Sequence, residues 1–284
     1  MSASQPSRLY PRLRAVVTRT TSGWNRMGFQ TQFYWQTLRG VADALKHYRI
    51  EVVRLMAQMS LGTGALAIIG GTVVVVGFLT LSAGSLIAVQ AYSQLQQIGV
   101  EALAGFTSAY LNVRIISPLV AGIGLAATIG AGATAQLGAM RISEEIDALD
   151  VMGIRSMVYL ASTRVVAGII VVIPLYCIAV LMAFMATRFG TTFVNGQSTG
   201  VYDHYFDTFL NPVDLIWSFV QAVSMAIVIM LIHTYYGFTA SGGPAGVGEA
   251  VGRAVRASLI TAVFVVLFLS LAIYGRSGNF HLAG

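Results

Sequence analysis

Residues 117–154 read SPLVAGIGLAATIGAGATAQLGAMRISEEIDALDVMGI, and this stretch decides the fold. Its first part lies within residues 115–140, which contain no Asp, Glu, Lys or Arg. About 20 consecutive apolar residues are enough for a helix to cross a bilayer. Directly afterwards, Arg141–Asp150 holds one arginine and four carboxylates in ten residues. The stretch therefore predicts a membrane-crossing helix that ends in a charged segment at the membrane surface.

Outside this stretch, the chain repeats the same charge-free pattern. Only 10% of the 284 residues are charged and 56% are hydrophobic, whereas a soluble domain carries about 25% charged residues. We therefore predict an all-α polytopic membrane protein with about five transmembrane helices. The charge-free intervals 55–100 and 215–248 are longer than one membrane crossing requires, so we place their spans at 61–82 and 215–238. We expect residues 83–114 to be an amphipathic or re-entrant connection. The other charge-free intervals are 55–100, 165–187, 215–248 and 257–275.

The N-terminal part differs from the rest of the chain. Residues 1–30 are polar and Arg-rich and are expected to form a basic flexible arm. Residues 31–59 are expected to form an amphipathic helix in the membrane interface, and residues 60–284 the transmembrane domain. The alternative for 31–59 is an ordinary surface helix of a soluble domain, but little soluble domain remains for it to cover. The apolar face of this helix recurs at steps of three and four, as Leu38, Val41, Leu45, Tyr48, Val52, Leu55 and Met59.

Basic residues predict the orientation. Residues 1–54 contain nine Lys and Arg against two acidic residues. With the N-terminus inside, the cytoplasmic segments carry 14 basic residues and the opposite side only Arg114, Arg188 and Arg276. This bias fits the positive-inside rule and predicts a multi-pass plasma (inner) membrane protein with a cytoplasmic N-terminus and an extracytoplasmic C-terminus. A nucleic-acid-binding arm is the alternative, but no nucleic-acid fold follows it, so no nucleic-acid partner is expected.

Several function classes lack the residues that they need. A nucleotide-binding P-loop requires a lysine after its glycines, and the only lysine, Lys46, lies in ADALKHY. No catalytic residues, metal site or cofactor are therefore expected in this chain. Asp203, His204 and Asp207 make a poor metal signature, and interfacial aromatic packing is the preferred interpretation. His233 is the only ionisable group within the predicted spans and is expected to be hydrogen bonded beside two tyrosines, so ion-coupled transport has little support.

The second predicted span carries a ridge of small residues. These residues recur every four positions, which allows another helix to approach the backbone closely. The sequence leaves open whether this helix packs only within its own subunit or at a subunit interface, and the two are not exclusive. The ridge consists of Gly122, Ala126, Gly130, Thr134 and Gly138.

The charged segment that follows is expected to form a short cytoplasmic helix at about 141–153. Ser143 is a plausible N-cap and Gly153 a plausible C-terminal stop. One face would be apolar, through Ile142, Ile146, Leu149 and Met152. Such a short helix is marginal alone, so it is expected to dock on a partner, although a solvated loop is the alternative. The polar residues available to that partner are Arg141, Glu144, Glu145, Asp147 and Asp150.

The run 117–154, followed by YLASTRVVAG at 159–168, resembles the MlaE/YrbE permease family, as does GFTASGGPAGVGEAVGRAVRASL at 237–259. The resemblance covers roughly residues 60–284. NVRIISP and NGQSTGVYDHYF resemble the B-type YrbE subunits of actinobacterial Mce systems. The family resemblance implies the MlaE-like permease fold, and it implies that the chain is a permease subunit of an ABC-type lipid importer. The implied partners are a cytoplasmic ABC ATPase dimer that binds ATP and Mg²⁺, a second permease, MCE-domain proteins and membrane lipid.

Within this family the segment 141–153 would be the coupling helix that inserts into the ATPase. Three positions depart from the family pattern, which commonly has Arg at Thr128, Glu at Gln136 and an acid at Ile115. These departures lead to the hypothesis that the second permease is a non-identical YrbE-type chain that keeps the charged residues. A non-transporting membrane scaffold is the alternative function. The identity of the lipid, whether fatty acid, phospholipid or sterol, does not follow from the sequence.

Overall fold

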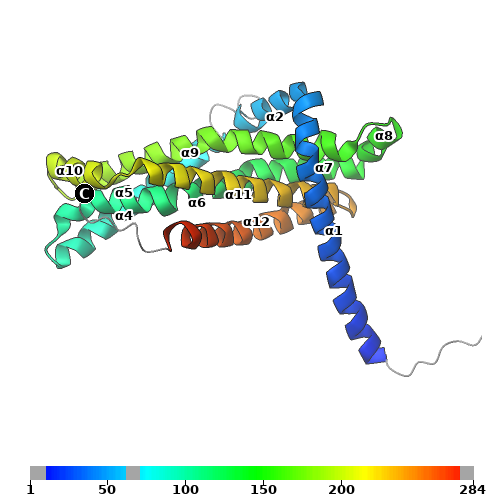
Figure 1. Cartoon of the computed structure of the whole chain (residues 1–284), viewed down its shortest axis with the longest axis horizontal. Coiled ribbons are helices and arrows are strands. Elements are labelled where there is room, and N and C mark those ends of the chain that lie inside the picture. Colours follow the sequence, from blue (N-terminus) through cyan, green and yellow to red (C-terminus); the bar gives the residue numbers. More distant parts are fainter. Residues whose placement is uncertain (1–10, 62–70, 276–284) are drawn as a thin grey trace, which may run out of the picture.

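The computed structural model describes residues 11–61 and 71–275, and the side chains of 27–59 and 71–275. These residues form helices and contain no strand, so the predicted all-α polytopic fold is confirmed (Figure 1). Five helices are long and apolar enough to cross a membrane, as expected. They are Thr72–Gln97, Glu101–Ile142, Met157–Val194, Pro212–Phe238 and Gly243–Tyr274.

Shorter elements make up these spans and their connections. In chain order they are α1 (Pro11–His47), α2 (Arg49–Leu61), α4 (Thr72–Gln97), η1 (Glu101–Leu103), α5 (Ala104–Leu111), η2 (Asn112–Ile116), α6 (Ser117–Gly124), η3 (Leu125–Gly130), α7 (Ala131–Ile142), α8 (Glu145–Val151), η4 (Met157–Ser162), α9 (Thr163–Phe189), η5 (Gly190–Val194), α10 (Thr199–Phe209), α11 (Pro212–Phe238) and α12 (Gly243–Tyr274).

The first two spans lie elsewhere than predicted. The first is α4, at 72–97 instead of 61–82, and residues 62–70 lie outside the described part of the chain. The expected connection at 83–114 is wrong, because α4 continues to Gln97 and the second span already begins at Glu101. Between them the chain reverses at Gly99, whose φ of 71° favours glycine. Residues 55–100 contain no charged residue, so no charge in the sequence marked where the first span begins and ends.

Four of the segments labelled η are π-helical and interrupt the long helices. They are η2 and η3 in the second span and η4 and η5 at the two ends of α9. A π turn adds one residue to a helical turn and often occurs at functional sites. The second span therefore runs as one continuous helical line from Glu101 to Ile142, with two changes in the phase of its side chains.

The core lies between α4, α6, α9, α11 and α12 and is filled by aliphatic side chains such as Val172, Leu175, Met225 and Ile229. The most apolar windows of the second and third spans are each 56% buried. The corresponding windows of α4 and α12 are only 28% and 17% buried. These two helices therefore lie at the outside and present apolar surface to lipid or to a partner, as Phe264 and Phe268 do on α12.

Helix α1 lies across one end of the bundle, at a steep angle to the long helices (Figure 1). Among the residues of α1 whose side chains are described, Phe33, Thr37, Gly40 and Ala44 are buried. The backbone approaches η4 closely at Gly40, where a Cβ would overlap with the hydroxyl of Ser162. The helix begins at Pro11 and so includes part of the segment expected as a flexible arm, while the segment expected as one helix, 31–59, is divided at Tyr48.

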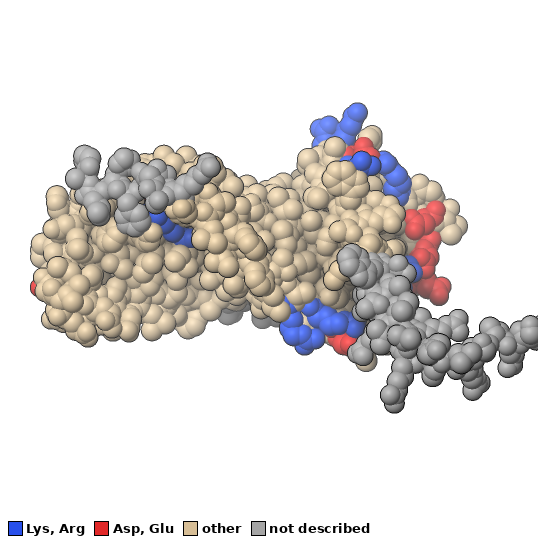
Figure 2. Space-filling view, turned by 60° about the horizontal axis from the view of Figure 1, so that its bottom comes forward, with Lys and Arg blue, Asp and Glu red and all other residues tan. Residues whose placement is uncertain are grey.

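On the face shown in Figure 2, most of the visible charged side chains gather at the end of the molecule that carries α1 and α8. The apolar residues predicted as one face of the segment 31–59 are divided between two environments. Leu38 and Leu45 are 40% and 47% exposed, whereas Val52 and Leu55 of α2 are buried in the protein. This distribution fits a helix that lies in a membrane interface, where apolar side chains remain outside the protein core.

Candidate functional site

Helix α8 is the short element at the tip of the second span. Arg141 and Ile142 still belong to α7, and the chain reverses at Glu144, whose φ of 61° is left-handed. The predicted N-cap at Ser143 is wrong, because its hydroxyl donates to the Ala139 carbonyl and to a Glu145 carboxylate oxygen. Gly153 follows α8 with a φ of 78°, as a C-terminal stop requires. The helix itself therefore spans seven residues, Glu145–Val151, instead of 141–153.

The four carboxylates of this segment have different surroundings. Asp147 accepts a 2.6 Å hydrogen bond from Arg141 and so joins α8 to the end of α7. Asp150 accepts from the backbone N–H of Ser156 at 3.2 Å, where the third span begins. Glu144 and Glu145 are exposed, and neither forms an ion pair with a residue in the described part of the chain. Two carboxylates therefore hold the turn, and two remain accessible to a partner.

The apolar side of α8 is packed at Ile146 and Leu149 but not at its C-terminal end. Ile146 is 1% exposed and lies in a cluster with Leu137 and Leu160. Val151 and Met152, by contrast, are 88% and 66% exposed at the tip. A helix this short is held by its packing and not by its own hydrogen bonds. The arrangement leaves a small apolar tip next to the two exposed glutamates.

The small-residue ridge of the second span packs against α11 and α12 of the same chain. A Cβ on Gly122 would overlap with Met225, and one on Gly138 with Val247. Five positions spaced by four would drift around a regular α-helix, which has 3.6 residues per turn. The wider π turn at η3 lies within the ridge and opposes this drift. It therefore helps to keep the ridge directed at the same neighbouring helices.

His233 of α11 is the polar centre of this packing. Its Nδ1 lies 2.8 Å from the Thr134 hydroxyl, and its Nε2 lies 3.1 Å from the hydroxyl of Ser258 on α12. A Cβ on Gly130 would overlap with the imidazole ring. The histidine was expected to be hydrogen bonded in the interface, but it is fully buried and joins three helices.

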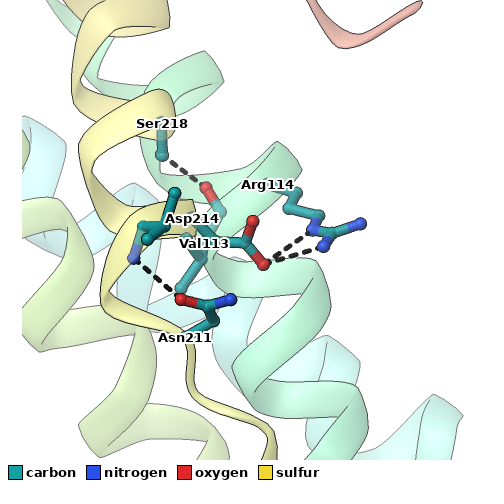
Figure 3. A network of polar contacts seen from close by, with 6 residues as sticks. Val113, Arg114, Asn211, Asp214 and Ser218 are labelled. Carbon is teal, nitrogen blue, oxygen red and sulfur yellow. Dashed lines mark hydrogen bonds and ion pairs between the residues drawn. The ribbon is translucent and has the colours of Figure 1, made fainter. Parts of the chain in front are cut away.

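A second polar group lies near the other end of the bundle, around Arg114 in η2 (Figure 3). Its Nη2 and Nε donate to the same carboxylate oxygen of Asp214, at 2.7 and 3.2 Å. Its guanidinium carbon also lies 4.2 Å from the ring centroids of both Tyr110 and Tyr274, which is a cation–π distance. The pair has low exposure, at 14% and 20% of the two side chains. The cation is thus neutralised by a residue from a different span.

Asp214 is held in this place by the start of α11. Asn211 caps the helix by accepting from the backbone N–H of Val213 at 2.9 Å, and Asp214 follows in the first turn (Figure 3). Ser218, one turn later, donates to the Val113 carbonyl at 2.5 Å. Sequence reasoning missed Asp214. The available signal was its position at the start of a span, on the same side of the membrane as Arg114.

The Arg114–Asp214 pair borders a groove of about 390 Å³ between the second span and α12. Arg114, Ser270 and the two tyrosines provide its polar wall. An ion pathway would require charged or carbonyl ligands along its length, whereas this groove suits a molecule with a long apolar part. Its remaining lining is aliphatic and consists of Ile115, Leu119, Val263, Val266 and Leu267.

A second, smaller hollow is lined by two of the residues that depart from the family pattern. Thr128 and Gln136 border a space of about 190 Å³ near the start of α4. The Thr128 hydroxyl lies 2.9 Å from that of Thr72, and Gln136 is exposed. The hollow therefore has a mixed lining, with Thr and Gln side chains among aliphatic ones, and no charged residue is among those that line it.

The segment around Asp203 is built from an ion pair and aromatic contacts. Arg188 donates two hydrogen bonds of 2.8 Å to this carboxylate, which lowers the pKa of Asp203 below its ordinary value. Burial raises the pKa of Tyr202 on the same helix to about 12. Phe206 packs edge-on against Phe184 of α9 at 4.9 Å. Within the described residues, no group of three His, Cys, Asp or Glu side chains is placed to hold a metal ion.

Comparison with known proteins places this chain among permeases. It is 29% identical over 195 residues to a probable ABC transporter permease protein of Rickettsia bellii, across 66% of this chain and 72% of the relative. It is 28% identical over 198 residues to the chloroplastic protein TRIGALACTOSYLDIACYLGLYCEROL 1 of Arabidopsis thaliana, across 69% of this chain and 56% of that protein. A probable ABC transporter permease protein of Synechocystis is 27% identical over 174 residues, across 58% and 63%.

The family model for Permease MlaE matches residues 61–272, which include all five apolar spans up to the last turn of α12. Relatives in Rickettsia and Synechocystis carry the name probable ABC transporter permease protein, and in ABC transporters of this permease family a separate subunit carries the ATPase activity. The apolar spans, the exposed tip at α8 and these relatives are consistent with one another. This chain therefore belongs to the MlaE permease family and is a multi-pass permease subunit of the ABC transporter type.

Proposed function

We propose that this chain is the permease subunit of an Mce-type ABC importer and forms part of a lipid path through the plasma membrane. The observation that carries the proposal is the course of the second span, Glu101–Ile142. Near one end it borders the aliphatic groove beside Arg114, and at the other end it leads directly into α8. A movement of α8 would thus be passed along one helix to the groove. The groove fits hydrocarbon chains, while the neutralised Arg114 suits the polar end of a lipid.

Coupling to ATP hydrolysis is proposed to occur through α8. The exposed Glu144 and Glu145, with Val151 and Met152 at the tip, would contact a cytoplasmic ABC ATPase dimer that holds ATP and Mg²⁺. Asp147 would act less directly, because it is already bound to Arg141. In this proposal the N-terminus is cytoplasmic, the chain is not itself an enzyme and MCE-domain proteins continue the lipid path on the opposite side.

A second, non-identical YrbE-type permease is proposed to complete the membrane path. Support comes from Thr128 and Gln136, which place uncharged polar groups in the lining of the smaller hollow on this chain. Gly132 lies on the same side of α7, and a Cβ there would meet open space, so this face can admit another helix. Purification of the intact complex, followed by intact-mass measurement of each membrane subunit, tests this pairing. Two copies of this chain with no second permease would exclude it.

Reconstitution tests the transport function. The complete complex in liposomes is expected to move a labelled lipid in an ATP-dependent way, and replacement of Leu119 and Val266 in the groove by Trp is expected to slow this movement. The ATPase should still co-purify with that variant. If this chain were only a scaffold, filling the groove would leave transport unchanged, while disruption of α8 would cause the complex to dissociate. Mass spectrometry of co-purifying lipids would identify the transported class.

A further inference from the structure

A separate hollow of about 430 Å³ lies where α1 and α2 meet, and it shares no lining residue with the Arg114 groove. It is lined by the consecutive residues 46–51 and by Tyr159 of the third span. The break between the two helices at Tyr48 places the last turn of α1 and the first turn of α2 around one space. Tyr48 and Tyr159 form an edge-to-face pair at 5.2 Å, which fixes one wall of this hollow.

The charges around this hollow do not cancel. Lys46 and Arg49 are exposed, and neither has an ion-pair partner in the described part of the chain. Glu51 is the only carboxylate in the lining, and it pairs with Arg54 at 3.6 Å and also interacts electrostatically with the buried Arg164. The hollow therefore keeps two uncompensated cations, with His47 between them, and favours an anionic ligand.

The other carboxylate on this part of α1 is also engaged. Asp43, one turn before Lys46, accepts a 2.9 Å contact from Arg155. It is therefore not available to neutralise Lys46. A phosphate is an anion that Lys and Arg side chains bind well, Lys as a point charge and Arg through paired donors.

Apolar side chains next to the hollow distinguish an amphiphile from a soluble anion. Ile50, which lines the hollow, is 88% exposed, and Val53, one turn later on α2, is 63% exposed. Leu45 on α1 is 47% exposed beside Lys46. A soluble phosphate gains nothing from such neighbours, whereas the acyl chains of a lipid would cover them.

We propose that the hollow at the α1–α2 junction binds the phosphate headgroup of an anionic phospholipid. Lys46 and Arg49 contact the phosphate, and the acyl chains lie along Ile50 and Val53. The site is distinct from the proposed transport path, and it requires only that α1 lies in the membrane interface. A bound lipid there holds α1 and α2 at the membrane surface beside the start of the third span.

The test is native mass spectrometry of the full-length chain in detergent, with equal amounts of phosphatidylglycerol and phosphatidylcholine. The wild-type chain is expected to retain phosphatidylglycerol preferentially. In the double variant K46Q/R49Q we expect roughly 30-fold weaker retention, because each basic side chain near an anionic lipid contributes about fivefold. The charge-conserving variant K46R/R49K is expected to retain the preference, which also controls for folding.

The matched control is R39Q/R256Q, which removes two exposed cations of α1 and α12 that do not line the hollow. The retention of phosphatidylglycerol by this control is expected to stay within twofold of that of the wild type. Unchanged lipid preference in K46Q/R49Q, or an equal loss in the control, would overturn the proposal. Displacement of the lipid by millimolar inorganic phosphate would overturn it in favour of a soluble-phosphate site. None of these readings depends on transport, so they stand apart from the proposed function.

Discussion

The guanidinium of Arg114 and the carboxylate of Asp214 meet at 2.7 Å, although 100 residues separate them in the chain. Through this pair the second span is fixed to the first turn of α11, beside a groove that is lined mainly by aliphatic side chains. Tyr110 and Tyr274 cover the cation from the sides. A partly buried charge that loses its partner is costly, so the two residues depend on each other.

Replacement of Asp214 by Asn is expected to destabilise the protein by about 1–3 kcal/mol, below the roughly 3–5 kcal/mol seen for fully buried pairs, because this pair is partly exposed. Thermal unfolding in detergent measures this loss. The double variant Arg114→Gln with Asp214→Asn removes both charges and should recover most of the stability. A D214N variant that unfolds at the wild-type temperature would show that the ion pair contributes nothing to stability.

Reversal of Glu144 and Glu145 to Lys is expected to release the ATPase while the isolated permease folds normally. These side chains are exposed and free of ion pairs within the described residues, so their charge is available to a partner. Breaking a charged contact at a buried interface costs about 2–5 kcal/mol, which corresponds to at least a 30-fold loss of affinity. Co-purification of the ATPase with tagged permease gives the measurement.

The control for this prediction is Glu249→Lys, which reverses another exposed carboxylate on α12, two residues after Val247, which lies against Gly138 of α7. It should leave co-purification of the ATPase unchanged. Asp147→Asn is expected to act differently, because it frees Arg141 and loosens α8 without removing an accessible charge. Equal effects of all three substitutions would contradict the assignment of Glu144 and Glu145 to the contact.

Replacement of Gly130 by Ala is expected to destabilise the bundle by about 1–3 kcal/mol, because the new Cβ would overlap with the ring of His233 in a tightly packed core. Gly132→Ala is the matched control on the same helical line, since a Cβ there meets open space. In the isolated chain it should be neutral or stabilising by up to about 1 kcal/mol, through helix propensity. Thermal unfolding compares the two, and equal melting temperatures would argue against the close approach.

The Asp203–Arg188 pair predicts a dependence of stability on pH. Hydrogen bonding to Arg188 lowers the pKa of Asp203 in the folded protein below its ordinary value of 3.8. A lowered pKa stabilises the fold above the unfolded value, and this contribution is lost as the pH falls through the folded value. The effect is small, because the side chains are 52% and 42% exposed.

We therefore expect the difference in melting temperature between wild type and Asp203→Asn to shrink as the pH falls from about 6 to about 3. The matched control is Asp207→Asn, which removes an exposed carboxylate of the same helix that forms no ion pair within the described residues. A difference between wild type and D203N that stays constant over this range would rule out the ion pair as its source.

Apolar, charge-free intervals predicted the five spans, because a bilayer requires helices of a fixed minimum length. They placed the fourth span, 215–238, close to its observed bounds, Pro212–Phe238, but did not predict where the other spans begin. Arg114 interrupted one interval and was assigned to a connection, although Asp214 neutralises it within the span. Arg164 likewise set the predicted start of the third span, yet it is buried within the helix and donates to the Leu160 carbonyl. Charges that are satisfied by tertiary contacts cannot be recognised from local composition.

Periodicity predicted part of the α8 segment. It identified Ile146 as packed and Gly153 as the end of the helix. It did not reveal the left-handed turn at Glu144, because this turn depends on how α7 ends and not on apolar spacing. Periodicity also did not show which carboxylates are bound within the chain and which are accessible. Asp150, for example, binds Ser156, which lies beyond the predicted helix. The side-chain roles within the segment therefore required the three-dimensional structure.

The π turns at η2 and η3 each contribute one residue beyond a regular helical turn to the second span. One residue corresponds to a rotation of about 100° around a helix axis. Deletion of a single residue in either segment would therefore turn the Arg114 half of the span away from Asp214, or the small-residue ridge away from His233. Among homologous chains, an alignment gap of one position here would mark a different angular setting of the same helix, with its length and hydropathy almost unchanged.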